Sequence, residues 1–259
     1  MSTVTKAIEL LNLFSAERAE IRLSEFQRLT GRDKTTTYRY LSALESTGLL
    51  EQDETSRAYR MGPAVLRFSH IRELTVPRRA GVRRVLPNLA DVSGETAHAS
   101  ILQGNTLVSL ADHTSAQHSA RVILDDAILP FHATASGLAV LAFASDKLRS
   151  AAYKKLSKYT EHTVTDRDEL NLLLSDTRKL GFGVSANSFE LGVSGIAVPL
   201  FDSSNNVAGA VAIASVASRV NDNLIRTIKS ELILAARNIT KSWGGSIPVS
   251  LDAAWSAQL

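Results

Sequence analysis

A predicted helix over residues 33–48 has two unlike faces, and it constrains the fold of this chain more than any other segment. One face follows the i, i+3, i+4, i+7 spacing of a stripe that packs on a core. That stripe consists of Thr37, Tyr40, Leu41 and Leu44. The other face carries cations and hydroxyl groups, with no carboxylate between Asp33 and Glu45 to repel phosphate, so it suits a DNA groove. Asp33 is a favourable N-cap and Gly48 a favourable stop.

The segments before this helix predict a helix-turn-helix. Ser24 can cap a short helix over about residues 25–30, and Gly31 then supplies the tight turn that the motif requires. An opening helix over about residues 3–14 completes the core of the module. Its inward side chains are Ala7, Leu10, Leu11 and Phe14.

The segment after the helix predicts a wing. Residues 49–52 and 57–61 flank a polar turn at 53–56, a pattern that favours a small hairpin. Its tip carries Arg57, placed to reach the sugar-phosphate backbone or a minor groove. The predicted DNA-contacting residues are Ser24, Lys34, Thr35, Thr36, Tyr38, Arg39, Ser42 and Arg57.

The distribution of charge agrees with this assignment. Residues 1–84 contain 15 Lys and Arg against 10 Asp and Glu, whereas the remaining residues contain 14 against 16. The basic excess therefore lies where phosphate contact is predicted. The alternative is a basic helix face that is merely solvated, but the succession of helix, helix-turn-helix and wing favours DNA binding.

Length and composition set the outer bounds. A chain of 259 residues with 44% hydrophobic and 21% charged content can form a DNA-binding module of about 75 residues and one further core domain. Cysteine is absent, which excludes disulfides, thiolate chemistry and Cys-based zinc sites. Neither a signal peptide nor a membrane helix is indicated, so we expect a cytoplasmic protein with no membrane partner.

We divide the chain into a winged helix-turn-helix domain at residues 1–62, a linker helix at 63–76, a second domain at 77–245 and a C-terminal tail at 246–259. The linker helix carries an apolar stripe that needs a partner. We predict pairing with the same helix of a second subunit, because two recognition helices would then face one duplex. Packing on its own chain is the alternative. The stripe consists of Val65, Phe68, Ile71 and Leu74.

The second domain opens with a predicted amphipathic helix over about residues 77–93, whose outer arginines either contact phosphate or form a solvated face. They are Arg78, Arg79, Arg83 and Arg84. The hydrophobic period then changes from helical to strand-like at Gly94. Strands segregated from helices indicate an α+β sheet with helices packed against it, and the tail has little pattern. We expect strands over 96–102, 106–110, 120–124, 195–201 and 207–216, and helices over 134–144, 146–156, 168–180 and 221–243.

The chain resembles the IclR family of transcriptional regulators over nearly its whole length, and three stretches, in order, carry that resemblance. The first is the winged module, in which Lys34-Thr35-Thr36 opens the recognition helix. The second is LPFHATASGLAVLA at residues 129–142, similar to a conserved segment of that family. The third is GFGVS at 181–185 followed by FELGVSGIAVP at 189–199, which is close to the family's C-terminal signature.

The resemblance implies a GAF-like effector-binding domain, a homodimer or a dimer of dimers on palindromic double-stranded DNA, and control of transcription by a small metabolite. It also implies a pocket at the helix start near residue 134, the loop before the signature acid Glu190, and the inward positions of the last strand. The corresponding effector-binding residues are Ala133, Thr134, Ser136, Gly137, Ser185, Asn187, Glu190, Gly195, Ala212 and Ala214.

The residues are compatible with a pocket for an acid. Thr134 or His132 can cap a helix whose first turn has small residues, which leaves backbone N–H groups to receive a carboxylate. Ala212 and Ala214 offer no hydrogen bond, which predicts a roomier and more apolar pocket than in relatives that bind very small polar acids. The alternative is that both alanines belong to the core. Glu190 either ties down its loop or contacts the ligand.

No catalytic arrangement emerges from the sequence. Asp112, His113 and His118 lie in a predicted loop with a spacing that fits no compact metal motif. The segment 192–195 resembles a nucleophile elbow only in part, because Ile196 stands where that motif has its last glycine. There is no glycine-rich phosphate loop. We therefore expect no enzyme activity, no metal and no cofactor.

The expected function is a ligand-responsive, DNA-binding transcriptional regulator that represses rather than activates genes of small-molecule catabolism or transport. Its expected effector is a small organic or aromatic acid. Two alternatives stay open: a GAF-like sensor that acts through a protein partner, and a catalytic second domain, which would require an acid-base pair that the sequence does not reveal.

Overall fold

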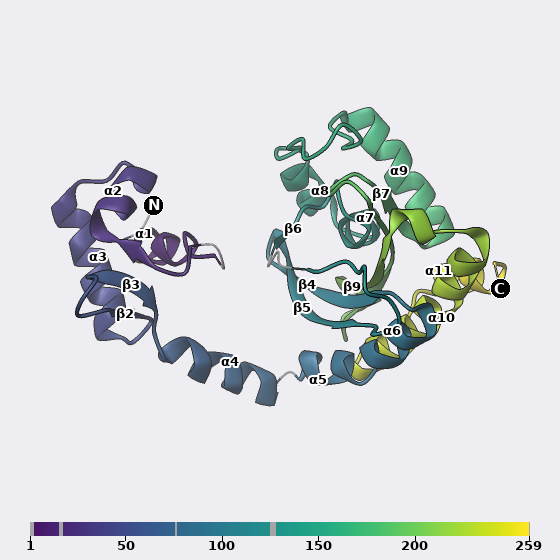
Figure 1. Ribbon diagram of the computed structural model, residues 1–259, viewed down its shortest axis with the longest axis horizontal. Coiled ribbons are helices and arrows are strands. Elements are labelled where there is room, and N and C mark those ends of the chain that lie inside the picture. The colour runs from purple at the N-terminus through teal and green to yellow at the C-terminus, as the bar shows by residue number, and fades with distance from the viewer. Residues whose placement is uncertain (1–2, 16–17, 76, 125–127, 259) are drawn as a thin grey trace. The chain divides into compact units, whose positions relative to one another are not determined.

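The structure is a computed structural model that describes residues 3–15, 18–75, 77–124 and 128–258. The chain divides into two units, Met1–Val76 and Pro77–Leu259, and the predicted linker helix is part of the first (Figure 1). Residues 1, 76 and 259, at which predicted domain boundaries fall, lie outside the described residues.

The first unit is a winged helix-turn-helix with one more strand than predicted. Its three-stranded antiparallel sheet has the order β1-β3-β2, because Ile21 and Arg22 pair with the second strand of the wing. The core is built around Leu10, Phe26, Leu41 and Tyr59, all fully buried. The elements are α1 (Thr3–Leu11), β1 (Ile21–Arg22), α2 (Leu23–Thr30), α3 (Lys34–Ser46), β2 (Leu50–Gln52), β3 (Ala58–Met61) and α4 (Ala64–Thr75).

Local capping chemistry positions α3 as predicted. Asp33 caps the helix by accepting the backbone N–H of Thr36 at 2.8 Å, and Gly31 closes α2 with a left-handed φ of 67°. The four buried residues of α3 are those of the predicted stripe. The predicted role of Ser24 as a helix cap is wrong, because the chain enters α2 directly from β1 and the N-cap position is Arg22.

The second unit is built on a six-stranded antiparallel sheet with the order β6-β5-β4-β9-β8-β7. The central strand β9 pairs on one side with β4, residue 98 opposite residue 212, and on the other with β8, residue 195 opposite residue 214. The α+β class predicted from the sequence is confirmed. The strands are β4 (Thr96–Gln103), β5 (Thr106–Thr114), β6 (Ile128–Leu129), β7 (Gly183–Ala186), β8 (Val193–Phe201) and β9 (Val207–Val216).

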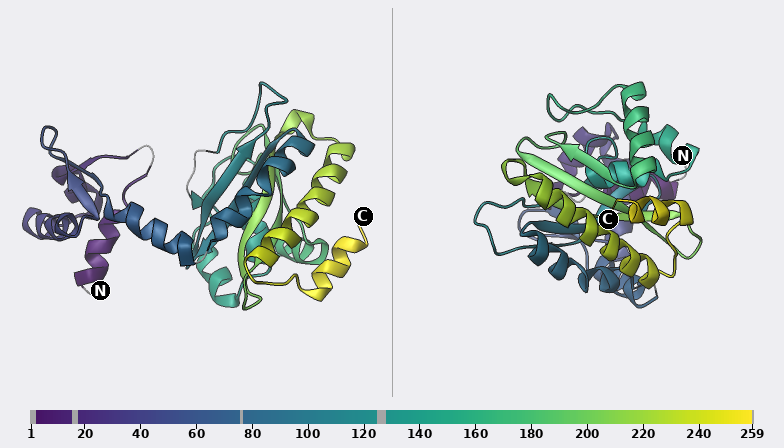
Figure 2. Two further views of the ribbon diagram at one scale, coloured as in Figure 1. Left: turned by 90° about the horizontal axis from the view of Figure 1, so that it is seen from below. Right: turned by 90° about the vertical axis from the view of Figure 1, so that its right-hand side faces the viewer.

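Helices cover both faces of this sheet. On one face α10 contacts β8, β9 and α6, and on the other α7 contacts β7, β8, β9 and α9 (Figures 1 and 2). Among the described residues, no helix is long and apolar enough to span a membrane. The helices are α5 (Arg78–Arg83), α6 (Leu86–Ser93), α7 (Ala135–Ala142), α8 (Asp146–Ala152), α9 (Arg167–Leu180), α10 (Asp222–Ser242) and α11 (Val249–Ser256).

Small side chains allow α7 to lie very close to the sheet. A Cβ atom added to Gly183 on β7 would stand 2.3 Å from the carbonyl oxygen of Ala135 and 2.7 Å from the backbone nitrogen of Ala139. On β8, a Cβ at Gly195 would stand 3.0 Å from the Cβ of Ala135. The helix start therefore rests on strand backbone, and this contact sets the position of the α7 N-terminus.

Two predicted elements of the second domain are wrong. The single helix expected over residues 77–93 is divided into α5 and α6, because Pro87 lacks an N–H and its ring clashes with the carbonyl four residues earlier. Of its supposedly outer arginines, Arg78 is mostly buried, with its guanidinium 5.0 Å from the ring centroid of Trp243. Residues 120–124 form no strand, and the edge position next to β5 belongs to β6.

The predicted tail at 246–259 also differs from the structure. Residues 249–256 form α11, which packs on α9 and buries Leu251 and Trp255. The indole N–H of Trp255 donates to the carbonyl of Gly181 at 3.2 Å. Only two of the eight residues in this helix are buried, Leu251 and Trp255. So short a hydrophobic pattern is too weak to reveal the helix from the sequence.

The close contact between α7 and β7 predicts a specific packing defect. Gly183→Ala should lower the free energy of unfolding of the second unit by about 1–3 kcal/mol, because the new methyl group meets backbone atoms that cannot rotate away. Val184→Ala, on the half-exposed neighbouring position, is the control and should cost less. Urea unfolding followed by the fluorescence of Trp243 and Trp255 measures both; equal losses would contradict this packing argument.

Candidate functional site

The outward face of α3 is open to solvent in the first unit. Lys34, Thr35, Tyr38, Arg39 and Ser42 are exposed, and Thr36 is half-buried. None of these side chains forms an ion pair with a described residue. The face therefore offers donors and positive charge, and the Arg39 guanidinium lies 5.5 Å from the ring centroid of Tyr40.

A hollow of about 390 Å³ lies where α2, α3 and the wing meet. It brings together four of the predicted DNA-contacting residues, and Thr35, Thr36, Arg39 and Ser42 lie outside it. Sequence reasoning missed Arg22, Gln27 and Gln52, since only strand pairing by β1 reveals that they face the same hollow. The lining residues are Arg22, Leu23, Ser24, Gln27, Lys34, Tyr38, Gln52, Arg57 and Tyr59.

The tip of the wing is held by local hydrogen bonds. The Asp53 carboxylate accepts the backbone N–H of Ser56 at 2.7 Å, and this bond lowers the pKa of that carboxyl group. Arg57 follows in a left-handed conformation with φ of 57°, and its carbonyl accepts the side-chain amide of Gln52 at 2.9 Å. The exposed arginine therefore stands on an ordered turn.

Helix α4 presents apolar side chains to solvent along its length. Leu66 is 75% exposed and Leu74 is 70% exposed, values that are costly for a helix with no partner. The exposed apolar residues are Val65, Leu66, Phe68, Ile71 and Leu74.

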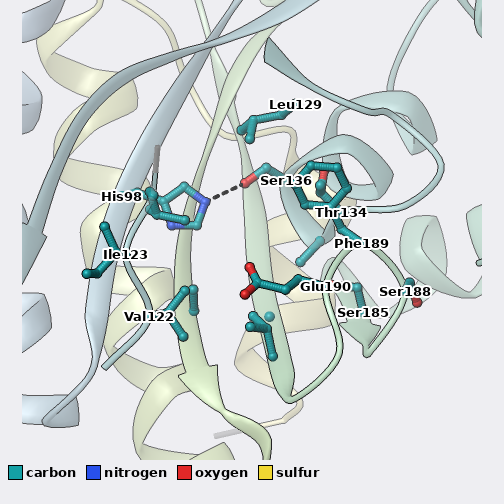
Figure 3. A pocket seen from close by; sticks show the side chains of 15 residues that line it. His98, Val122, Ile123, Leu129, Thr134, Ser136, Ser185, Ser188, Phe189 and Glu190 are labelled. Carbon is teal, nitrogen blue, oxygen red and sulfur yellow. Dashed lines mark hydrogen bonds between the residues drawn. The ribbon is translucent and has the colours of Figure 1, made fainter. Parts of the chain in front are cut away.

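The second unit contains a cavity of about 80 Å³ at the start of α7, which we call the effector cavity (Figure 3). Its walls come from β4, β8, β9 and the loops around residues 122–124 and 185–190. The lining residues are His98, Val122, Ile123, Leu124, Leu129, Thr134, Ala135, Ser136, Ser185, Ser188, Phe189, Glu190, Val193, Gly195 and Ala214.

Six of the ten residues predicted to bind the effector line this cavity, and four do not. Ala133 and Ala212 are buried in the core, and Gly137 abuts Phe131, whose carbonyl oxygen would lie 2.4 Å from an added Cβ. Asn187 has a structural part, since its side chain accepts the N–H of Gly192 at 2.7 Å and holds the loop. The six that line the cavity are Thr134, Ser136, Ser185, Glu190, Gly195 and Ala214.

His98 is the cavity residue that sequence reasoning missed most clearly. Its Nε2 lies 3.2 Å from the hydroxyl oxygen of Ser136, and its Nδ1 is buried with no hydrogen-bond partner among the described residues (Figure 3). Burial lowers the pKa of the imidazole from 6.5 to about 4, so the ring is neutral at pH 7. The signal in the sequence was a histidine between two alanines on a predicted strand.

The cavity is small, and a roomier pocket than in relatives that bind very small acids stays a prediction. Ala214 and, from the neighbouring strand, His98 both line it. A cavity of about 150 Å³ accommodates benzene, and this one measures about 80 Å³. It therefore matches a ligand of only a few non-hydrogen atoms unless its mouth opens.

Some polar groups of the cavity already form hydrogen bonds within the protein, and others are free within the described part of the chain. The Thr134 hydroxyl donates to the carbonyl of Pro130 at 2.8 Å and accepts the N–H of Gly137 at 3.0 Å, so it caps α7 as predicted and is not free for a ligand. The backbone N–H groups of Ala135 and Ser136 have no acceptor among the described residues. They form the open N-terminus of a helix and attract negative charge.

Hydrogen bonds from outside the cavity fix its loops. The hydroxyl groups of Thr160 and Thr163 donate to the carbonyls of Asn187 and Ser188, each at 2.6 Å. These bonds hold the loop just before Phe189 and Glu190, and the Glu190 carboxylate is directed into the cavity (Figure 3). Glu190 is the one charged side chain among the described lining residues.

The opposite wall is held by an ion pair. Arg219 donates to both oxygens of the buried Glu95 carboxylate at 2.7 Å and also to the carbonyl of Ala120 at 2.8 Å. Next to it, the Thr96 hydroxyl donates to the carbonyl of Val122 at 2.7 Å. Residues 120–124, expected as a strand, are thus held as a loop, and Val122, Ile123 and Leu124 of this loop line the cavity.

Both parts of the chain match models of known protein domains. The model of the bacterial transcriptional regulator IclR C-terminal domain matches residues 73–241, and that of the IclR helix-turn-helix domain matches residues 3–54. The transcriptional repressor IclR of Escherichia coli (strain K12) is 25% identical, with 95% of this chain and 91% of that protein covered.

Solved structures of IclR-type proteins have the same fold as this chain. An IclR transcriptional regulator from Silicibacter sp. TM1040 is 40% identical with a TM-score of 0.92, covering 96% of this chain and 99% of that one. An IclR homolog from Microbacterium hydrocarbonoxydans, complexed with 4-hydroxybenzoate, is 21% identical with a TM-score of 0.74, covering 93% and 99%.

The buried neutral histidine predicts a pH dependence of stability. Between about pH 4 and 6.5 the unfolded chain binds more protons than the folded chain at His98, so stability from this group is complete above pH 6.5 and falls with decreasing pH. The loss should be on the order of 1 kcal/mol per pH unit. His98→Gln should remove this component, whereas the exposed His113→Gln should keep it. The free energy of unfolding is measured between about pH 4 and 6.5 by urea unfolding followed by tryptophan fluorescence. If it falls with pH equally in wild type and in His98→Gln, the assignment to His98 is refuted.

Proposed function

Because this chain belongs to the IclR family and is therefore a transcriptional regulator, we propose that it is a homodimeric repressor released from or retained on its operator by a small organic acid. The genes it controls would serve the catabolism or transport of small molecules, and it would act in the cytoplasm. The observation that carries this proposal is the combination of an exposed cationic α3 face in one unit and a small cavity in the other.

The proposed DNA interface consists of α3 in the major groove and the wing beside it. The exposed side chains of Lys34, Thr35, Tyr38, Arg39 and Ser42 lie on the face that would meet base edges and phosphates. Arg57 on the ordered wing tip would contact the backbone or a minor groove. Arg22 and Gln27, which share a hollow with Lys34 and Tyr38, would join the phosphate contacts.

We further propose that α4 pairs with its counterpart in a second subunit. Five apolar side chains on this helix are exposed, and pairing would remove them from water. A two-fold dimer would present two recognition helices to a palindromic operator about one helical turn apart. A dimer of dimers is the natural extension for an operator with repeated half-sites.

The proposed effector is a small monocarboxylic acid. Its carboxylate would accept the free backbone N–H groups of Ala135 and Ser136 together with the Ser136 hydroxyl. Glu190 would repel a second carboxylate but could accept a hydroxyl or amine group of the ligand (Figure 3). An aromatic acid such as 4-hydroxybenzoate, bound by one structural relative, would need a wider cavity than about 80 Å³.

Coupling between the two units would be a shift between two populated states. A ligand that binds one state better changes the spacing of the paired recognition helices, and both half-sites are contacted only when that spacing matches the duplex. A coupling free energy of about 1–3 kcal/mol changes operator affinity about 5- to 150-fold, which suffices for regulation.

Arg39→Ala should weaken binding to the operator by about tenfold and reduce the slope of log K against log salt by about one, because one phosphate contact is lost. Lys179→Ala, which removes an exposed charge from the other unit, is the control and should leave both quantities unchanged. Fluorescence anisotropy on specific and random duplexes measures them. A wild-type protein that binds no duplex at any salt concentration would favour the alternative of a sensor acting through a protein partner.

Ser136→Phe should abolish the response to the effector while sparing operator binding, because the ring fills the effector cavity and leaves the first unit untouched. A thermal-shift screen of small aliphatic acids and of 4-hydroxybenzoate identifies the stabilising ligand with wild-type protein. Ser136→Ala, which loses the contact with His98 without adding volume, is the milder companion variant. If Ser136→Phe still responds to that ligand with unchanged affinity, the effector binds elsewhere.

A further inference from the structure

A second, larger cleft lies in the effector domain, between β6 and the segment that follows α8; both elements are labelled in Figure 1. Its volume is about 610 Å³, within the range of small-molecule sites and several times that of the effector cavity. Neither DNA binding nor the proposed effector uses it. We call it the β6–α8 cleft.

Charge distinguishes the β6–α8 cleft from the effector cavity. Among its described lining residues, Lys154 and Lys155 are charged and none is acidic, whereas the effector cavity carries Glu190 and no lysine or arginine. Neither lysine forms an ion pair with a described residue, and both are exposed. The cleft therefore holds two uncompensated positive charges, which attract an anion.

One wall of the cleft is aromatic and held in place. The ring of Tyr159 is 45% exposed and packs edge-on against Phe189, with the centroids 4.8 Å apart. On its other side the ring of His132 lies at 5.9 Å, and the Nε2–H of His132 donates to the carbonyl of Ser157 at 2.8 Å. The backbone N–H of Tyr159 donates to Thr163 at 3.0 Å. The exposed ring is thus a fixed surface on which a planar group can stack.

The two cavities share a partition. Phe189 and Leu129 line both of them, and Phe189 follows the two carbonyls that the threonine hydroxyls hold. A molecule in the cleft therefore contacts Phe189, the residue that precedes Glu190. A ligand in either cavity would contact, and could shift, the Phe189 side chain.

We propose that the β6–α8 cleft is a second small-molecule site that takes a planar organic anion. The planar part stacks on Tyr159, and the negative group lies between Lys154 and Lys155. Because Phe189 is shared, binding in the cleft changes the affinity of the effector cavity and the reverse, by the same factor. The site is defined by its own residues and does not depend on the effector proposed above.

The test is isothermal titration of the full-length protein with 1-naphthoate up to about 1 mM at low salt, where charge interactions are strongest. Wild type should bind it saturably, and 1-naphthalenemethanol, a neutral molecule of similar shape, should bind about tenfold more weakly. The double variant Lys154→Gln/Lys155→Gln should weaken naphthoate binding by about tenfold and leave the neutral compound unaffected. Lys158→Gln, an exposed lysine of the same segment that does not line the cleft, should bind naphthoate as wild type does.

Ser136→Phe separates this site from the effector cavity. If naphthoate binding survives in Ser136→Phe and is weakened about tenfold in the double lysine variant, the cleft is the site even if no acid ever acts as effector. If binding is lost in Ser136→Phe and retained in the double lysine variant, the anion occupies the effector cavity and this proposal is overturned. Absence of saturable binding to wild type, or equal loss in Lys158→Gln, overturns it as well.

Discussion

The close approach of α7 to the strand backbone is the constraint on which the second domain depends. Gly183 and Gly195 have no side chain at the points where Ala135 rests on the sheet, and any larger residue there would push the helix outward. Because the helix start is fixed in this way, Ala135 and Ser136, whose backbone N–H groups are free of acceptors from the described residues, line the cavity. The polar end of the proposed ligand site thus follows from a packing requirement between small residues.

The sequence predicted what local chemistry decides. The buried stripe of α3, its cap Asp33 and the left-handed Gly31 each depend on neighbours within four residues, and the structure has all of them. Elements that depend on distant partners were missed: α11 is held by Trp255 against Gly181, and β1 exists only because β3 pairs with it. Propensity alone gives no account of such contacts.

In the candidate site, too, residues in recognisable sequence segments were predicted and a residue brought in by a distant strand was not. Residues of the α7 segment and of the signature loop were placed at the cavity because they carry a family resemblance, whereas His98 lies on another strand and reaches Ser136 only through the pairing of β4 with β9. Two alanines on one strand suggested a roomy pocket; of the two only Ala214 lines the cavity, together with the imidazole of the adjacent strand.

The central β4–β9 pairing has a consequence for how this domain assembles. The Ser100 hydroxyl meets the carbonyl of Ala210 across 110 residues of chain, so the two middle strands are joined only after a very long loop closes. Pairings of such high contact order form slowly and late in folding. Since the cavity draws its walls from both strands, a partly folded chain lacks it, and a ligand of this cavity can bind only after the sheet is complete.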